Sequence, residues 1–397
     1  MISKKMASFL GKSSLIRAMF EEGKKLKAEY GSDNVYDFSL GNPNVPAPIE
    51  VNRAIIDLIE NEDPVLLHGY MSNQGFEDVR EVVANSLNKK HGTSFTSNNI
   101  LMTVGAAAGL NIIFKTLLDP GDEVIVLKPY FLEYGNYVRN YDGVLVEVDT
   151  LKDSFMPDYD ALKSAINDKT KAVIINSPHN PTGVVYSEDT IVKIAEVLRA
   201  KESELNKTIY LISDEPYREL VYDGVEVPYL TKYYDDTIVA YSYSKSLSLP
   251  GERIGYLVIP DEASCSEDIM GAATIANRIM GFVNAPSLIQ RVIGKCIDAA
   301  VDLDFYDVNR KLLYNRLKEL GLECVLPQGA FYLFVKSPIE DERIFIEMGK
   351  QHNILMVPGS AFSAPGYVRL AYCVSKACIE NSLPAFASLM EDVKNLR

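Results

Sequence analysis

The chain has 397 residues, of which 47% are hydrophobic and 24% are charged, and its formal net charge is −14. This length predicts about two to three domains, and the composition is that of a folded chain rather than a disordered one. The acidic balance disfavours nucleic acid and anionic membranes as partners, because their phosphates would be repelled.

The cysteines and histidines argue against disulfide and metal chemistry. The five cysteines are scattered and odd in number, which does not fit a disulfide framework. The four histidines form no HExxH motif and no two-histidine cluster, so we expect no metal site. Met1–Phe20 does not read as a secretory signal, and no stretch approaches the ~18 apolar residues of a membrane span. We therefore expect a cytoplasmic protein with reduced thiols.

From about residue 100 to 260, short apolar runs alternate with helical periods. This alternation predicts a largely parallel sheet with helices on both faces. The strands that we expect are Asn99–Val104, Glu123–Leu127, Lys171–Asn176, Ile209–Ser213, Thr237–Tyr241 and Ile254–Ile259. In such sheets, ligands bind at the carboxyl ends of the strands.

The pattern changes after about residue 287. A long helical pattern, interrupted near Asp302–Asp304, covers Leu288–Leu320. The short strands expected beyond it are Cys324–Leu326, Phe331–Val335, Ile354–Val357 and Tyr367–Ala371. Together with a helical Leu15–Tyr30, they predict a smaller α+β domain made of residues 1–44 and 287–397. Residues 45–286 form the predicted large domain.

Short motifs follow the strands of the predicted large domain, and one more stands near the end of the chain. In chain order they are Gly105-Ala106-Ala107-Ala108-Gly109, Asn180-Pro181-Thr182-Gly183, Asp214-Glu215-Pro216-Tyr217, Ser242-Tyr243-Ser244-Lys245, Pro250-Gly251-Glu252-Arg253-Ile254-Gly255 and Val368-Arg369-Leu370. Singly, each is weak: a small-residue turn before a helix fits phosphate binding or close packing equally well, and a lone lysine is usually a surface charge. Their order and spacing together are specific.

As a set, these motifs resemble the class I aminotransferases, the aspartate-aminotransferase-like fold type I family of pyridoxal-phosphate enzymes. The resemblance runs from Gly41-Asn42-Pro43 to Arg369. It implies an α/β fold in which a mostly parallel seven-stranded sheet, flanked by helices, is joined to a smaller α+β domain. It also implies pyridoxal 5'-phosphate as the cofactor and amino-group transfer between an L-amino acid and a 2-oxo acid.

The resemblance implies catalytic roles for Lys245, Asp214 and Tyr217. Lys245 would hold the cofactor as a Schiff base and, once the substrate amine has displaced it, move the proton between the substrate α-carbon and the cofactor C4'. Asp214 would keep the pyridine nitrogen protonated. Tyr217 and Asn180 would hydrogen-bond the cofactor phenolate oxygen and lower the imine pKa.

The resemblance also implies which residues bind phosphate and substrate. The phosphate site would consist of the backbone N–H groups of Gly105, Ala106 and Ala107, the Ser242 hydroxyl and the Arg253 guanidinium. Tyr130 would stack on the cofactor ring. Tyr70 would reach the phosphate of a neighbouring subunit, which implies a homodimer with shared sites. Arg369 would bind the substrate α-carboxylate, with Gly41 and Asn180 nearby.

The amino acid substrate stays open. One branch of the family has a lysine for a second carboxylate where this chain has Ala107, and Arg278 and Arg291 are substitutes only by their place in the sequence. Aspartate and an aromatic or neutral amino acid are therefore both candidates. The alternative activity is a pyridoxal-phosphate C–S β-lyase or a related lyase, such as a cyclopropane-carboxylate synthase type, since it would use the same residues.

Two readings from other classes are weaker. A DNA-binding regulator built on this fold would need an extra domain, for which the chain has no room. A nicotinamide oxidoreductase would need a GxGxxG motif after an early strand, and none is present.

Overall fold

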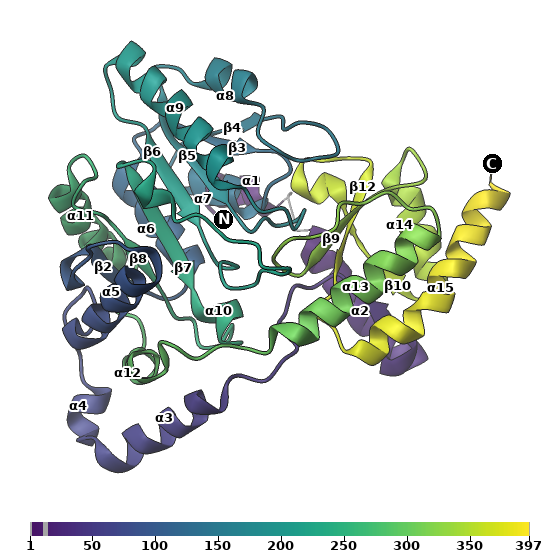
Figure 1. Cartoon of the computed structure of the whole chain (residues 1–397), viewed down its shortest axis with the longest axis horizontal. Helices are drawn as coiled ribbons and strands as arrows, with labels where there is room; N and C mark the ends of the chain where they lie inside the picture. The colour runs from purple at the N-terminus through teal and green to yellow at the C-terminus, as the bar shows by residue number, and fades with distance from the viewer. Residues whose placement is uncertain (1, 11–14, 397) are drawn as a thin grey trace.

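A seven-stranded sheet forms the centre of the larger part of the molecule in a computed structural model, which describes residues 2–10 and 15–396 (Figure 1). In spatial order its strands are β2 (Ile100–Thr103), β8 (Gly255–Val258), β7 (Thr237–Ser242), β6 (Tyr210–Asp214), β5 (Thr170–Asn176), β3 (Glu123–Leu127) and β4 (Val144–Val148). Strands β4, β3, β5, β6 and β7 run parallel, whereas β8 is antiparallel to both β7 and β2. The predicted fold class is confirmed.

Both faces of this sheet are covered by helices, which explains why its strands read as continuous apolar runs. Alternate residues of β3 enter different cores: Val124 packs in the core that contains α6, α7 and α11, and Ile125 packs in the core that contains α8 and α9. These helices are α6 (Ala106–Leu117), α7 (Glu133–Asn140), α8 (Tyr159–Ala165), α9 (Glu188–Leu205) and α11 (Ser266–Ile279). The end of the sheet at β2 and β8 packs with α3 (Ile49–Asn61), α4 (Pro64–His68), α5 (Glu77–His91) and α12 (Ser287–Cys296).

The smaller part of the molecule contains about the C-terminal quarter of the chain, after α12, and the segment before residue 45. Its three-stranded antiparallel sheet has the order β11 (Val357–Pro358), β12 (Tyr367–Ala371) and β9 (Tyr332–Lys336). β1 (Tyr36–Asp37) pairs in parallel with β10 (Ile354–Leu355). The helices here are α2 (Leu15–Tyr30), α13 (Leu303–Glu319), α14 (Glu342–Gln351) and α15 (Lys376–Asn395). The N-terminal segment therefore packs with the C-terminal one, as predicted. The predicted strand Cys324–Leu326 is not observed as a strand, because Cys324 forms only an isolated bridge to Val335.

Helix α12 belongs with the larger part. It packs against α3 and α5, and its buried side chains join the core beneath β2 and β8. The predicted domain boundary between residues 286 and 287 assigns α12 to the small domain, although its packing partners α3 and α5 belong to the large one. We therefore propose that the boundary between the two domains lies after α12.

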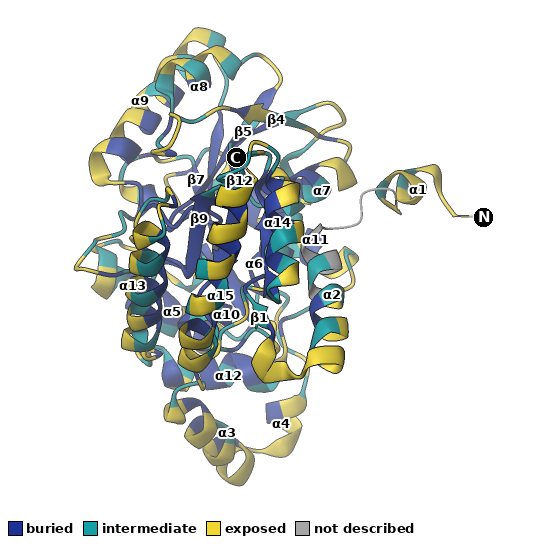
Figure 2. Ribbon diagram, turned by 90° about the vertical axis from the view of Figure 1, so that its right-hand side faces the viewer, coloured by how far each residue is buried: buried dark blue, intermediate teal, exposed yellow. Residues whose placement is uncertain are grey.

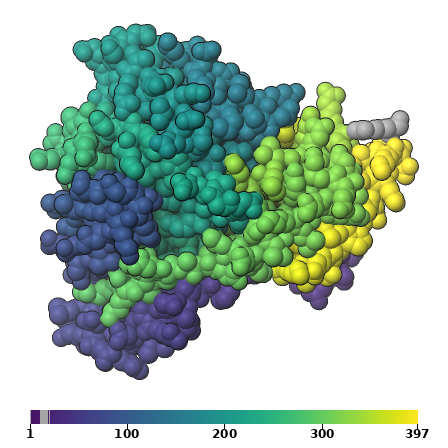
Figure 3. Space-filling model, in the orientation of Figure 1, coloured from purple at the N-terminus to yellow at the C-terminus, as the bar shows by residue number. Residues whose placement is uncertain are grey.

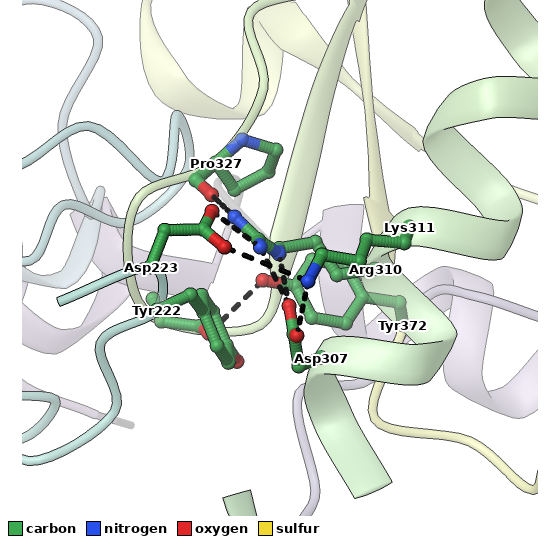
Figure 4. A network of polar contacts seen from close by, with 8 residues as sticks. Tyr222, Asp223, Asp307, Arg310, Lys311, Pro327 and Tyr372 are labelled. Atoms are coloured by element: carbon green, nitrogen blue, oxygen red, sulfur yellow. Dashed lines mark hydrogen bonds and ion pairs between the residues drawn. The ribbon is translucent and has the colours of Figure 1, made fainter. Parts of the chain in front are cut away.

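Arg310 of α13 links the two parts of the molecule (Figure 4). Its side chain is fully buried, and its guanidinium donates to Asp223 (2.6 Å), to Asp307 (2.8 Å) and to the carbonyl of Pro327 (2.6 Å). Asp223 lies on the loop after β6, so this arginine connects the small domain to a loop of the large one.

Figure 2 shows which elements are buried: the strands of the large sheet are mostly coloured as buried, whereas much of α3 is coloured as exposed. Within the described residues, no helix is both long and apolar enough to span a bilayer.

Candidate active site

A cavity of about 290 Å³ opens where β5, β6 and β7 end and α6 begins. The carboxyl ends of parallel strands meet at one edge of a sheet, so residues far apart in the sequence come together there. The predicted residues that line it are Gly41, Ala106, Ala107, Asn180, Asp214, Tyr217, Ser242, Lys245, Arg253 and Arg369. Side chains from both parts of the molecule therefore face one space.

One side of the cavity is a turn with free backbone donors. Gly105 precedes α6 with φ +89°, which favours glycine, and a methyl group there would lie 2.9 Å from Nη2 of Arg253. The first N–H groups of α6 have no partner within the helix, and the helix dipole makes this end positive. Ser242 is close by and shares a 2.7 Å hydrogen bond with the hydroxyl of Ser244. The arrangement fits an anion.

Asp214 stands at the end of β6 with one carboxylate oxygen satisfied and one free. Tyr134 donates to its Oδ2 (2.5 Å), whereas Oδ1 is buried and has no hydrogen-bond partner among the described residues. Burial raises the pKa of this carboxyl to about 7, and the bond from Tyr134 opposes that rise. The free oxygen therefore fits a ligand that brings a hydrogen-bond donor, best of all a cationic one.

Lys245 lies on the short helix α10 (Tyr243–Ser246), and its amine is half-buried. Nζ donates to the carbonyl of Gly41 (2.8 Å), on the segment from the smaller part of the molecule. Burial lowers the pKa of the Lys245 ammonium to about 8. An amine with this pKa is partly unprotonated near neutral pH, so it is able to act as a nucleophile or a base.

Arg369 lies on β12 with only 2% of its surface exposed. It donates to Oδ1 of Asn180 (3.2 Å) and to the carbonyl of Ser39 (2.7 Å), and its Nε has no partner among the described residues. No carboxylate is among these partners, although a buried guanidinium usually has one. Its charge is therefore available to an anionic substrate.

Comparisons with known proteins agree with this geometry. The family model of aminotransferase class I and II matches residues 33–386. A probable aspartate/prephenate aminotransferase of Thermus aquaticus is 35% identical over 81% of this chain and 84% of its own length. A solved aminotransferase of Eubacterium rectale is 48% identical, with a TM-score of 0.96 and 99% of each chain covered. The aspartate aminotransferase of Thermus thermophilus, solved with maleate, is 29% identical, with a TM-score of 0.87, 98% of this chain and 99% of that chain covered.

The chain belongs to aminotransferase class I and II. The predicted family and the predicted activity, an enzyme that transfers amino groups, are thereby confirmed.

In this aminotransferase, Tyr130 does not lie where the sequence predicts. Its ring is buried outside the cavity, and its hydroxyl donates to Glu147 on β4 (2.6 Å). The backbone N–H of Tyr130 donates to the carbonyl of Phe362, which fixes this direction. Phe131, one residue later, lines the cavity instead. We therefore replace Tyr130 by Phe131 as the residue expected to pack on a bound ring.

Gly105, whose backbone forms the turn before α6, is not among the residues that line the cavity, and three other predicted residues also lie outside it. Tyr70 is 95% exposed, which leaves its predicted contact with another subunit untested. Arg278 is exposed on α11, and Arg291 contacts Asp78 (3.6 Å) and the ring of Phe76. Neither arginine lines the cavity.

Five polar residues that line the cavity are not predicted from the sequence: Tyr134, Tyr137, Asn176, Ser244 and Tyr332. Ser244 belongs to the motif Ser242-Tyr243-Ser244-Lys245, so its position in the sequence is a signal that could have identified it. Tyr332 lies on a predicted strand, where only burial of its hydroxyl would have marked it. Within the described residues, no group of three or more metal-ligating side chains is present.

Proposed function

We propose that this aminotransferase binds pyridoxal 5'-phosphate in the cavity and uses Lys245 to transfer an amino group between an L-amino acid and a 2-oxo acid. The observation that carries the proposal is Oδ1 of Asp214, a buried carboxylate oxygen that has no hydrogen-bond partner among the residues described by the structure. Such an oxygen is unfavourable unless a donor reaches it, and a protonated ring nitrogen would be that donor. When bound, the cofactor supplies the aldehyde that takes up the amino group and the ring that accepts electrons.

The phosphate fits the turn before α6. Gly105, Ala106 and Ala107 offer backbone N–H groups, and Arg253 lies against the same turn. The Ser242 hydroxyl is the remaining predicted donor. Arginine suits this task because its planar fork donates to two phosphate oxygens at once.

Lys245 is the amine that we expect the cofactor aldehyde to bind. With a pKa of about 8, its unprotonated form is populated at neutral pH, and that form would move the proton between the substrate α-carbon and C4' of the cofactor. Asp214 holds the ring nitrogen, and Tyr217 and Asn180 donate to the phenolate oxygen. The free Nε of Arg369 binds the α-carboxylate of the substrate, beside Gly41 and Asn180.

We further propose a homodimer. Helices α3 and α4 form a lobe at the lower left of Figures 1 and 3. Val65 is 77% exposed, Leu66 is 67% exposed and Tyr70 is 95% exposed, all within six residues of one another. Neighbouring exposed apolar side chains mark interaction sites, and Tyr70 would reach the partner's phosphate across this surface. A cytoplasmic location stays a prediction.

The substrate side chain is a finer question. Relatives in Thermus are named aspartate/prephenate aminotransferases. In this chain Ala107 lines the cavity where a branch of the family has a lysine, and the described cations of the cavity are Lys245, Arg253 and Arg369. Each of them already has a role, so we retain an aromatic or neutral amino acid beside aspartate as the donor.

The test is a transfer assay with the cofactor-loaded enzyme, 2-oxoglutarate and a panel of amino acids. We expect one new amino acid for each donor consumed, and no turnover by Lys245→Ala. Release of pyruvate and ammonia from a cysteine conjugate, without a new amino acid, would instead support the β-lyase alternative and contradict the proposal.

A further inference from the structure

The hydroxyl of Tyr332 is held in one place from three sides. It lies 2.9 Å from the hydroxyl of Tyr217, which is its only hydrogen-bond partner in the described part of the chain. The ring of Tyr332 packs on Arg369, whose guanidinium carbon is 4.5 Å from the ring centre. Gly41 closes the third side, since a methyl group there would lie 2.0 Å from the Tyr332 oxygen. Pairing of Tyr332 with Ala371 of β12 fixes the backbone beneath it.

The direction of this hydrogen bond depends on what else Tyr217 binds. A tyrosine hydroxyl has one proton to donate and lone pairs to accept with. If Tyr217 donates its proton to an anionic oxygen in the cavity, the bond between the two tyrosines must use the proton of Tyr332. Hydrogen bonds in a chain polarise one another, so donation by Tyr332 makes Tyr217 a stronger donor.

We infer that Tyr332 is a positioning residue that donates to Tyr217 and thereby strengthens the bond from Tyr217 to the phenolate oxygen of the cofactor. The inference rests on the proposed function. It concerns a hydroxyl that no motif of the sequence marks, and it predicts a property of the bound cofactor. A weaker bond to the phenolate oxygen makes the neighbouring nitrogen more basic. Loss of the Tyr332 hydroxyl should therefore raise the pH at which the bound cofactor loses its proton.

The experiment is a pH titration of the visible absorption of the cofactor-loaded enzyme. We expect Tyr332→Phe to raise the midpoint by about 0.3 to 1 pH unit, a two- to tenfold change in proton affinity. Tyr217→Phe should raise it further. The double variant should match Tyr217→Phe, because Tyr332 acts only through that residue. The control is Tyr372→Phe, which removes a buried hydroxyl bound to the carbonyl of Ala330 in the same core and should leave the midpoint unchanged.

An unchanged midpoint in Tyr332→Phe, or shifts that add in the double variant, would overturn the inference. Should Tyr332→Phe not fold, 2,3-difluorotyrosine at position 332 gives a test of opposite sign. That side chain is a stronger donor, so the midpoint should fall, and a midpoint that stays or rises contradicts the inference. Failure of the proposed function is distinguishable, since wild-type protein would then show no visible band after addition of pyridoxal 5'-phosphate.

Discussion

Asp214 and Tyr134 form a buried pair in which burial disfavours the ionised carboxylate and the hydrogen bond from Tyr134 favours it. Burial raises the pKa of Asp214 to about 7, and the 2.5 Å bond from Tyr134 opposes the rise. In the proposed function, the carboxylate must be ionised to hold a protonated ring nitrogen. We therefore infer a functional role for Tyr134, which lies 80 residues before Asp214 in the sequence.

We predict that Tyr134→Phe weakens binding of pyridoxal 5'-phosphate about tenfold near neutral pH, since a hydrogen bond to a charged group contributes about 1.5–3 kcal/mol. Without Tyr134 the pKa of Asp214 rises further, so more of the carboxyl is protonated and must lose its proton on binding. The loss of affinity should therefore grow as pH falls from 8 to 6. Absorbance titrations at several pH values measure it. Tyr141→Phe, which removes a hydroxyl bound to Asn111, is the matched control. Equal affinity of Tyr134→Phe and wild type at pH 6 would contradict this role.

At the scale of elements, the turn between β2 and α6 carries the proposed phosphate site. Gly105 combines a positive φ with contact to Arg253. Gly121 has a similar φ of +92°, but a methyl group there would meet nothing within 4 Å. Comparing alanine substitutions at these two positions therefore distinguishes the cost of backbone strain from the effect on the proposed phosphate site.

We predict that Gly105→Ala weakens binding of pyridoxal 5'-phosphate about tenfold or more, because the strained turn and the displaced guanidinium no longer match the phosphate. Gly121→Ala should lower stability by about 1 kcal/mol with unchanged affinity. Pyridoxal, which has no phosphate, serves as the second ligand. If Gly105→Ala weakens pyridoxal as much as its phosphate ester, the turn does not bind phosphate.

The sequence predicts elements better than it predicts directions of side chains. The apolar runs predict the first and last residues of β3 and β12 correctly, because both strands are buried and bounded by turns. The sequence does not predict β4, because this strand lies at the sheet edge, where Val144 and the second-to-last residue, Glu147, are both exposed. The sequence predicts Tyr130 as the stacking residue, but its neighbour Phe131 is aromatic too, and only the course of the backbone after β3 decides which ring enters the cavity.

At the scale of the whole molecule, Arg310 connects the two domains through Asp223, and it also binds Asp307 and the carbonyl of Pro327 within the small domain. We predict that Arg310→Ala lowers the free energy of unfolding by about 2–4 kcal/mol, because it removes a buried cation from several partners at once. Arg316→Ala, on the exposed side of the same helix, breaks only a surface pair with Glu319 and should change it by less than about 1 kcal/mol. Urea denaturation compares the two, and equal effects would contradict a special role for Arg310.

The shared site of the proposed dimer predicts complementation between two variants that each have a defective site. Tyr70→Phe retains Lys245 but lacks the hydroxyl offered to the partner, whereas Lys245→Ala retains that hydroxyl. A mixed dimer has one complete site. After joint refolding in equal amounts, half of the dimers are mixed, so about a quarter of the sites and of the wild-type activity should return. Activity no higher than the mean of the separate variants would show that Tyr70 does not act across subunits.

The central claim is that Lys245 binds the cofactor, and it is tested most directly by borohydride reduction. Protein loaded with pyridoxal 5'-phosphate is reduced, digested and analysed by mass spectrometry. We predict a stable phosphopyridoxyl group on the peptide that contains Lys245, and none on that peptide after preincubation with an amino acid substrate. A label on another lysine, or no label in protein that shows native folding, would contradict the account.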